Sequence, residues 1–200
     1  MCVDLSQQLV HLTRGTLAEA ERAFRSIVEQ RRLLGSSKGI RGGHKVVCFS
    51  EAPIEVLAKM FRSTGREFRY RPFGVMVPKA WLFVQGGRPV IYQPESEFDG
   101  LPEDLQYRHV RFDAPGAEKD FTFEREWRIK ADEVALDPLV CTLVVPDQEW
   151  DYRLREEHDA QDMRKASALQ MNPFTRISKY EWHVLALGDL GAEFPLNDEA

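Results

Sequence analysis

The chain has 200 residues, a net charge of −5 at pH 7, an apolar fraction of 43% and a mean hydropathy of −0.41. This size suits one large domain, and the acidic balance argues against a general nucleic-acid coat protein. The sequence shows no apolar run near the ~20 residues that cross a bilayer and no secretory leader, and its three scattered cysteines fit neither a disulfide framework nor a zinc site. We therefore expect a single cytoplasmic domain over residues 1–200, with no membrane segment and no metal.

The first third of the chain predicts a strand, a helix, a second strand and a second helix. An apolar strand lies within residues 3–13, and the capping box of Thr16 and Glu19 predicts a helix that begins at residue 17 and ends at Gly35. Residues 45–49 are apolar after the first, which is typical of a central strand, and Pro53 indicates a helix over 54–61. The stripe of the first helix that we expect to be buried consists of Leu17, Ala20, Phe24, Ile27, Val28 and Leu34.

Strands predominate in the middle of the chain. We expect them at 73–77, 89–92, 121–129, 139–145 and 180–187, whereas residues 101–112 are ambiguous between a short helix and an irregular segment. The charged stretch 147–170 predicts a helix that packs through Trp150, Leu154, Met163 and Leu169. Helices at both ends and strands between them indicate an α+β fold rather than alternating βαβ units.

Residues 121–129 read FTFEREWRI and form the most informative of these strands. Alternation would place Phe123, Trp127 and Ile129 on an apolar face, and Glu124 with Glu126 about 7 Å apart on the other face. Two acids held that close repel, so at least one should have a shifted pKa or be paired with a cation. The alternative is a solvent-facing ladder of ion pairs with Arg128, which would contribute only about 0–1 kcal/mol.

A basic and aromatic segment precedes the strand at 73–77. Its cations alternate with Phe61, Phe68 and Tyr70, and Glu67 is the one acid among them. Such a segment is typical of a surface that contacts phosphates and stacks on bases, although a solvated helix end and loop would have the same composition. The candidate nucleic-acid contacts are Lys59, Arg62, Arg66, Arg69 and Arg71.

Three strand-borne motifs occur in order: HLT at His11 to Thr13, CFS at Cys48 to Ser50, and the E-x-E of Glu124 and Glu126. The chain thereby resembles the ADP-ribosyltransferase superfamily, and more closely the AbiGi-type abortive-infection proteins of phage defence. The likeness extends over about residues 9–130, while residues 139–190 would complete the domain. It implies a split, mainly antiparallel sheet flanked by helices. The segments that carry the closer likeness are 48–53, 73–81, 86–92 and 124–128.

The resemblance implies a site for NAD as co-substrate. Glu126 would stabilise the oxocarbenium-like ribose as the nicotinamide bond breaks, and Glu124 would orient or deprotonate the acceptor. Ser50 would fix Glu126 or the nicotinamide ribose, or it would simply cap the helix after Pro53. The other expected contacts are the adenosine ribose with His11 and Thr13, the pyrophosphate with Arg14 or Arg128, and the nicotinamide with Phe49 and Tyr92, unless these two rings belong to the core.

The function that this resemblance implies is transfer of ADP-ribose to a macromolecule, in a toxin or phage-defence setting. The basic segment slightly favours RNA or DNA over protein as the acceptor. One alternative is a non-catalytic, antitoxin-like protein whose acidic surface binds a basic partner toxin. A further alternative is hydrolysis of NAD without a macromolecular acceptor.

Overall fold

A computed structural model describes residues 6–61, 69–113, 122–172 and 175–194. Its main sheet has seven strands in the order β11-β10-β4-β1-β3-β8-β5. All neighbouring strands in this sheet are antiparallel except β10 and β11, so the fold is a mixed α and β domain with a mainly antiparallel sheet flanked by helices. The strands are β1 (Gln8–Arg14), β3 (Val46–Ser50), β4 (Tyr70–Pro78), β5 (Arg88–Pro89), β8 (Glu126–Lys130), β10 (Thr142–Val145) and β11 (His183–Ala186).

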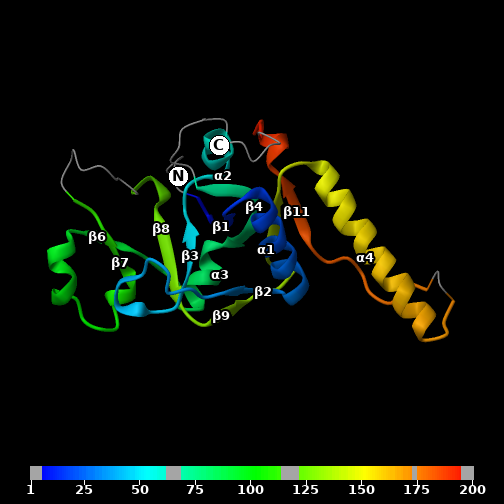
Figure 1. The fold of residues 1–200 in the computed structure, drawn as a ribbon, viewed down its shortest axis with the longest axis horizontal. Helices are drawn as coiled ribbons and strands as arrows, with labels where there is room; N and C mark the ends of the chain where they lie inside the picture. The colour runs from blue at the N-terminus through cyan, green and yellow to red at the C-terminus, as the bar shows by residue number, and fades with distance from the viewer. Residues whose placement is uncertain (1–5, 62–68, 114–121, 173–174, 195–200) are drawn as a thin grey trace.

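Two small sheets lie beside the main one. The antiparallel pair of β2 (Arg32–Leu34) and β9 (Glu133–Ala135) runs across one end of the strands, and the parallel pair of β6 (Ile91–Gln93) and β7 (His109–Arg111) lies at one end of the molecule (Figure 1). Short 3-10 turns at Arg41–Gly43, Glu95–Gly100 and Gln106–Arg108 surround the β6–β7 pair. The ambiguous segment 101–112 therefore holds a turn and a strand.

The helices cover the two faces of the main sheet because its strands alternate apolar residues between them. One core contains Leu9, Phe49 and Phe73 together with Phe24 of α1 (Leu17–Gln30) and Trp150 of α4 (Gln148–Ala168). The other face packs on α2 (Ile54–Met60) and the 3-10 turn Leu187–Leu190. Short α3 (Lys79–Val84) follows β4, and α4 reaches the end of the molecule opposite β6–β7 (Figure 1).

The predicted capping box is confirmed: Thr16 Oγ1 accepts a hydrogen bond from the Glu19 backbone N–H, and the Glu19 carboxylate accepts one from the Thr16 N–H. The predicted helix end at Gly35 is wrong. Helix α1 ends at Gln30 because Arg31 takes a left-handed conformation with φ of 51°, and residues 32–34 continue as β2. Leu34 therefore leaves the predicted stripe and is exposed.

One helix was not predicted, and two further predictions need correction. Helix α3 was not predicted, because residues 79–84 follow directly on the apolar run of β4. In α4, Met163 and Leu169 are exposed rather than packed, since the second half of that helix buries only Asp162 and Ala166. The strand at 121–129 is shorter than expected: Thr122–Glu124 form a 3-10 turn, and β8 begins only at Glu126.

Candidate functional site

Three neighbouring strands carry the three motifs. His11 lies on β1, Ser50 at the end of β3 and Glu126 at the start of β8, and β3 lies between the other two strands. Ser50 is the register partner of both Val10 and Glu126. Directly opposed residues of antiparallel strands project from the same face, so the Ser50 and Glu126 side chains share one side of the sheet.

The His11 side chain spans from β1 to β3. In the described part of the chain, these two strands have Val10 and Ser50 as their one register pair, whereas β3 pairs with β8 along five positions. His11 Nδ1 lies 2.8 Å from the Cys48 carbonyl oxygen, and its ring packs edge-on to Phe49. Because a carbonyl can only accept, Nδ1 must carry the proton; burial lowers the pKa of the ring and favours the neutral form, whose Nε2 is an acceptor.

Glu126 is held by a buried ion pair. Arg128 Nε donates to Glu126 Oε1 at 2.8 Å and Nη2 to Oε2 at 3.3 Å, while Nη1 donates to the carbonyl oxygens of Tyr107 and His109. The two side chains are only 13% and 7% exposed, for Glu126 and Arg128 respectively. The alternative of a solvent-facing ladder is therefore wrong: this pair fixes the carboxylate in one orientation.

Cys48 is a member of the site that the sequence did not single out. It is the register partner of Arg128 and lies close enough to Glu126 for a side-chain hydrogen bond. Burial, with the Glu126 charge as the next cause, raises the pKa of the Cys48 thiol to about 12. The thiol is therefore a neutral donor at physiological pH rather than a nucleophile. The available sequence signal was its two-residue spacing from Ser50 on one strand.

The turn before β8 places Glu124 off the strand. Arg125 has a left-handed φ of 45°, which is rare for a residue with a side chain and breaks the alternation on which a shared face for Glu124 and Glu126 depended. Ser50 Oγ donates to the Glu124 carbonyl oxygen at 2.6 Å and accepts from the Ala52 N–H. Ser50 thus anchors the turn. The helix-capping alternative is wrong, because the N-cap of α2 is Pro53 and makes no side-chain cap bond.

A short hydrogen-bond chain links Glu124 to the end of β1. Arg14 Nη2 donates to the Tyr70 hydroxyl at 2.6 Å, and this hydroxyl donates to Glu124 Oε2 at 2.9 Å. Burial raises the pKa of Glu124, opposed by Tyr70 and Arg14 and supported by the charge of Glu126. The expectation that at least one of the two acids would be paired with a cation or have a shifted pKa is thus confirmed: Arg128 pairs with Glu126, and burial raises the pKa of Glu124. Tyr70 was missed as a site residue, and its place among the basic residues of 59–71 was the one available signal.

The other residues predicted to contact NAD differ in how deeply they are buried. Thr13 is buried and its hydroxyl donates to the Phe73 carbonyl oxygen at 2.9 Å. Phe49 is 2% exposed and belongs to the core, which was the alternative to a contact with nicotinamide. Tyr92 is partly buried, and its hydroxyl accepts a hydrogen bond from the Glu126 N–H at 3.1 Å. Burial raises the pKa of Tyr92 to about 12.

Part of the basic segment can be located. Lys59 is exposed on the last turn of α2, Arg69 is exposed just before β4, and Arg71 Nε donates to the Gly15 carbonyl oxygen at 2.7 Å. Arg62 and Arg66 lie outside the described residues.

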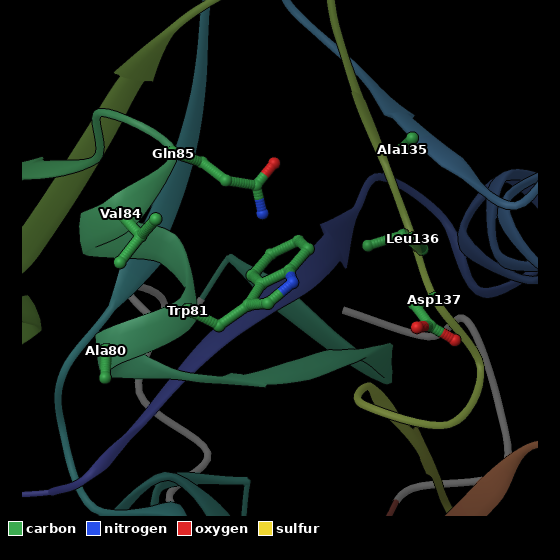
Figure 2. Close-up of a pocket in the computed structure, with 7 residues that line it drawn as sticks. All are labelled: Ala80, Trp81, Val84, Gln85, Ala135, Leu136 and Asp137. Carbon is green, nitrogen blue, oxygen red and sulfur yellow. The ribbon is translucent and has the colours of Figure 1, made fainter.

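A separate hollow of about 610 Å³ lies between α3 and the segment after β9. Figure 2 shows the Trp81 ring projecting into this space, with Gln85 on one side and Leu136 and Asp137 across from it. Trp81 is partly buried and also packs against the main core. None of the three motifs lines this hollow. Among the described residues, no group of three or more His, Cys, Asp or Glu side chains is arranged to hold a metal ion.

In comparisons with known proteins, no family model, no curated protein and no solved structure matches this chain. Within the ranges that the structure describes, no helix is both long and apolar enough to span a membrane.

Proposed function

We propose that this protein transfers ADP-ribose from NAD to a macromolecule. The observation that carries the proposal is the placement of His11, Ser50 and Glu126 on the adjacent strands β1, β3 and β8, with Glu124 in the turn that Ser50 anchors. The resemblance to ADP-ribosyltransferases predicts this arrangement, although the three motifs are separated by 39 and 76 residues (11 to 50 and 50 to 126).

The chemistry of Glu126 follows from its hydrogen bonds. Arg128 engages both carboxylate oxygens and the Cys48 thiol lies within reach of the same carboxylate, so at least one of its four lone pairs is left for a ligand. A ribose 2′-hydroxyl can donate to that lone pair, and the carboxylate then stabilises the positive charge that develops as the bond between nicotinamide and ribose lengthens. Since Arg128 is buried and is already bonded to Glu126 and to two backbone carbonyl oxygens, we assign it to positioning Glu126 and leave the pyrophosphate to the exposed Arg14.

His11 offers one further acceptor, although alternation along β1 places its side chain on the face of Phe49, opposite that of Ser50 and Glu126. With Nδ1 bonded to the Cys48 carbonyl, Nε2 of the neutral ring can accept a hydrogen bond from a ribose hydroxyl. Tyr92, next to the Glu126 backbone, remains our candidate for the nicotinamide wall, whereas the buried Thr13 and Phe49 support the strands that carry the site.

Glu124 is the candidate for contact with the acceptor. It lies in a turn rather than on the strand, and its raised pKa brings its proton affinity closer to that of a group that exchanges a proton near neutral pH. The left-handed Arg125 between the two acids separates their roles: Glu126 stays with its arginine, and Glu124 faces the turn.

The test supplies adenine-labelled NAD to a cell lysate and follows free nicotinamide and label on macromolecules. Glu126→Gln should lower nicotinamide release by about 10²-fold or more. Glu126→Asp keeps a charge for Arg128 and should also be strongly impaired, because the carboxylate is withdrawn by one methylene. Glu149→Gln, in an exposed pair on α4, is the matched control and should be fully active.

Full nicotinamide release by folded Glu126→Gln would overturn the proposal. Wild-type protein that shows neither release nor a thermal shift with NAD would favour the antitoxin-like binder instead. Free ADP-ribose as the sole product would reduce the activity to NAD hydrolysis.

A further inference from the structure

We propose that the hollow between α3 and the segment after β9 binds a small organic cation of the alkylated-ammonium class. We call this space the Trp81 hollow. Its volume of about 610 Å³ lies within the range of about 300–1,000 Å³ that is typical of small-molecule sites. None of the residues that we assign to NAD or its acceptor lines it, so this site is separate from the one proposed above.

The Trp81 ring offers an aromatic face to this space. It projects into the hollow from α3, although Trp81 also packs against the main core (Figure 2). Elsewhere in the chain, Lys79 Nζ lies 5.7 Å from the ring centroid of Trp127. Arg25 Cζ lies 5.2 Å from that of Trp150. Among the described residues, no cation lies over Trp81 in this way. Since an indole attracts cations more strongly than the other aromatic side chains, its face is available to a cation from solution.

The carboxylate of Asp137 lies across the hollow from the Trp81 ring (Figure 2). It is exposed, and its Oδ1 accepts a hydrogen bond from the Leu139 backbone N–H at 2.9 Å, which orients the group. Within the part of the chain that the structure describes, Oδ2 accepts no hydrogen bond and Asp137 forms no ion pair. The hollow therefore presents a negative charge opposite an aromatic face.

Other acids close to Asp137 in the chain already have a cationic partner. Asp132 pairs with Lys45 at 3.0 Å, and Glu133 of β9 pairs with Arg32 of β2 at 2.7 Å. Asp137 thus differs from its neighbours in sequence, because its charge is left to solvent or to a ligand.

The cations at the two ends of α3 are engaged elsewhere. Lys79, its first residue, pairs with Glu51. Arg88, which follows the helix, has its guanidinium 4.0 Å from the ring centroid of Phe83 and donates to the Phe83 carbonyl oxygen. Neither is available to neutralise Asp137, so a cation that enters the hollow meets an unmatched charge.

The remaining lining selects the kind of cation. Apart from Gln85, Asp137 and Trp81, the side chains that line the hollow are aliphatic. A metal ion or a primary ammonium is strongly hydrated, and one carboxylate does not replace its water shell. An alkylated ammonium instead places methyl groups on the aliphatic lining and on the indole face, which is how proteins recognise quaternary ammonium ligands. An anion would be repelled by Asp137, and a neutral ligand would leave that charge unmatched.

The experiment adds choline to ¹⁵N-labelled protein and follows the indole N–H signals of the four tryptophans by NMR. Trp81→Leu identifies the Trp81 signal by its absence. Choline should shift this signal saturably and leave the signals of Trp127, Trp150 and Trp182 in place. The neutral isostere 3,3-dimethylbutan-1-ol should bind about threefold to thirtyfold more weakly, because it lacks the charge that the ring and the carboxylate attract.

Two variants separate the charge from the ring. Asp137→Asn should weaken choline binding by about twofold to fivefold and leave the affinity for the alcohol unchanged. Asp104→Asn removes the same charge from an exposed turn outside the hollow and should bind choline like wild type. Trp81→Leu, followed through the backbone N–H of Gln85, should lose most of the preference for choline over the alcohol. Circular dichroism of each variant excludes loss of the fold as the cause.

A Trp81 signal that does not shift with choline would overturn the proposal. So would equal affinity for choline and its neutral isostere, which would reduce the hollow to an apolar site, or unchanged choline binding by Asp137→Asn. Tighter binding of a short arginine peptide than of choline would replace the small ligand by a protein partner. Since the assay contains no NAD, none of these results depends on the proposed transferase activity.

Discussion

Replacement of Glu126 by Gln tests both the buried ion pair and the site that it supports. Gln has the same length and can still accept one hydrogen bond from Arg128, but it removes the counter-charge of a guanidinium that is 7% exposed. The two other partners of Arg128, the carbonyl oxygens of Tyr107 and His109, are neutral. The variant therefore leaves the buried Arg128 guanidinium without a negatively charged partner.

The size of the effect follows from the burial. Removal of one partner of a buried pair costs about 3–5 kcal/mol, and the retained amide hydrogen bond returns about 1 kcal/mol. The net loss in unfolding free energy is about 2–4 kcal/mol. For a chain of this size each kcal/mol shifts Tm by about 2–4 °C, so Tm should fall by roughly 4–16 °C.

The assay is thermal unfolding at pH 7, followed by circular dichroism, with urea unfolding at 20 °C as a second measure. Glu149→Gln is the control: its partner Arg153 is half exposed, so that loss should be within about 1 kcal/mol. If Glu126→Gln unfolds at the same temperature as Glu149→Gln, the pair contributes no more than a surface ladder and the assignment of Arg128 as a positioning residue fails. The same measurement fixes the temperature below which nicotinamide release by the variant is meaningful.

Three further predictions concern the same region. The raised pKa of Glu124 means that its stabilising protonated form is lost as pH rises through that pKa, so Glu124→Gln should gain thermal stability over wild type at about pH 8 and show no gain at about pH 4; a gain that is equal at both values would contradict this. Alkylation of Cys48 by iodoacetamide at about pH 8, mapped by mass spectrometry, should be at least about 100-fold slower in the folded chain than in urea, because its pKa is about 12 when folded; equal rates would show that the thiol is not buried. Gly74→Ala should lower the free energy of unfolding, measured in urea, by about 2 kcal/mol or more, because the added Cβ would lie 2.1 Å from the His11 carbonyl oxygen. Gly100→Ala is the control, because there is open space around Gly100. Equal stability of the two variants would refute the close approach of β4 to β1.

The sequence predicted those helices and strands that are determined by residues close together in the chain. The capping box of Thr16 and Glu19, the uniformly apolar β3 and the start of α4 after Asp147 depend on side chains next to the backbone that they order. The strand order was not available in this way, because register is set by contacts between distant segments. The neighbours of β1, for example, are β3 and β4 rather than the strand next in sequence, β2.

The sequence predicted most residues of the candidate site, but not how they are arranged. The alternation of FTFEREWRI indicated a continuous strand, but the Arg125 conformation depends on tertiary bonds: its carbonyl oxygen accepts from the Glu51 N–H, and Ser50 holds the carbonyl oxygen of Glu124. No pattern in the segment itself reports these partners. The result changes the relation between the two acids, because Glu126 gains a buried arginine and Glu124 gains a tyrosine.

The segments that carry the family resemblance also hold a second, structural set of contacts. Glu51 is 9% exposed, and its carboxylate accepts hydrogen bonds from Lys79 Nζ and, at 2.7 Å, from Trp127 Nε1. These residues come from the CFSEAP, VPKAW and EREWR stretches, so one buried network joins β3, the start of α3 and β8. Each residue neighbours a site residue or continues its strand: Glu51 follows Ser50, and Trp127 follows Glu126. Since adjacent side chains of a strand point to opposite faces, β3 and β8 carry Ser50 and Glu126 on one side and use Phe49 and Trp127 on the other to lock the strands in register. Loss of the Glu51 carboxylate should therefore impair the site without touching it, through the spacing of β3 and β8.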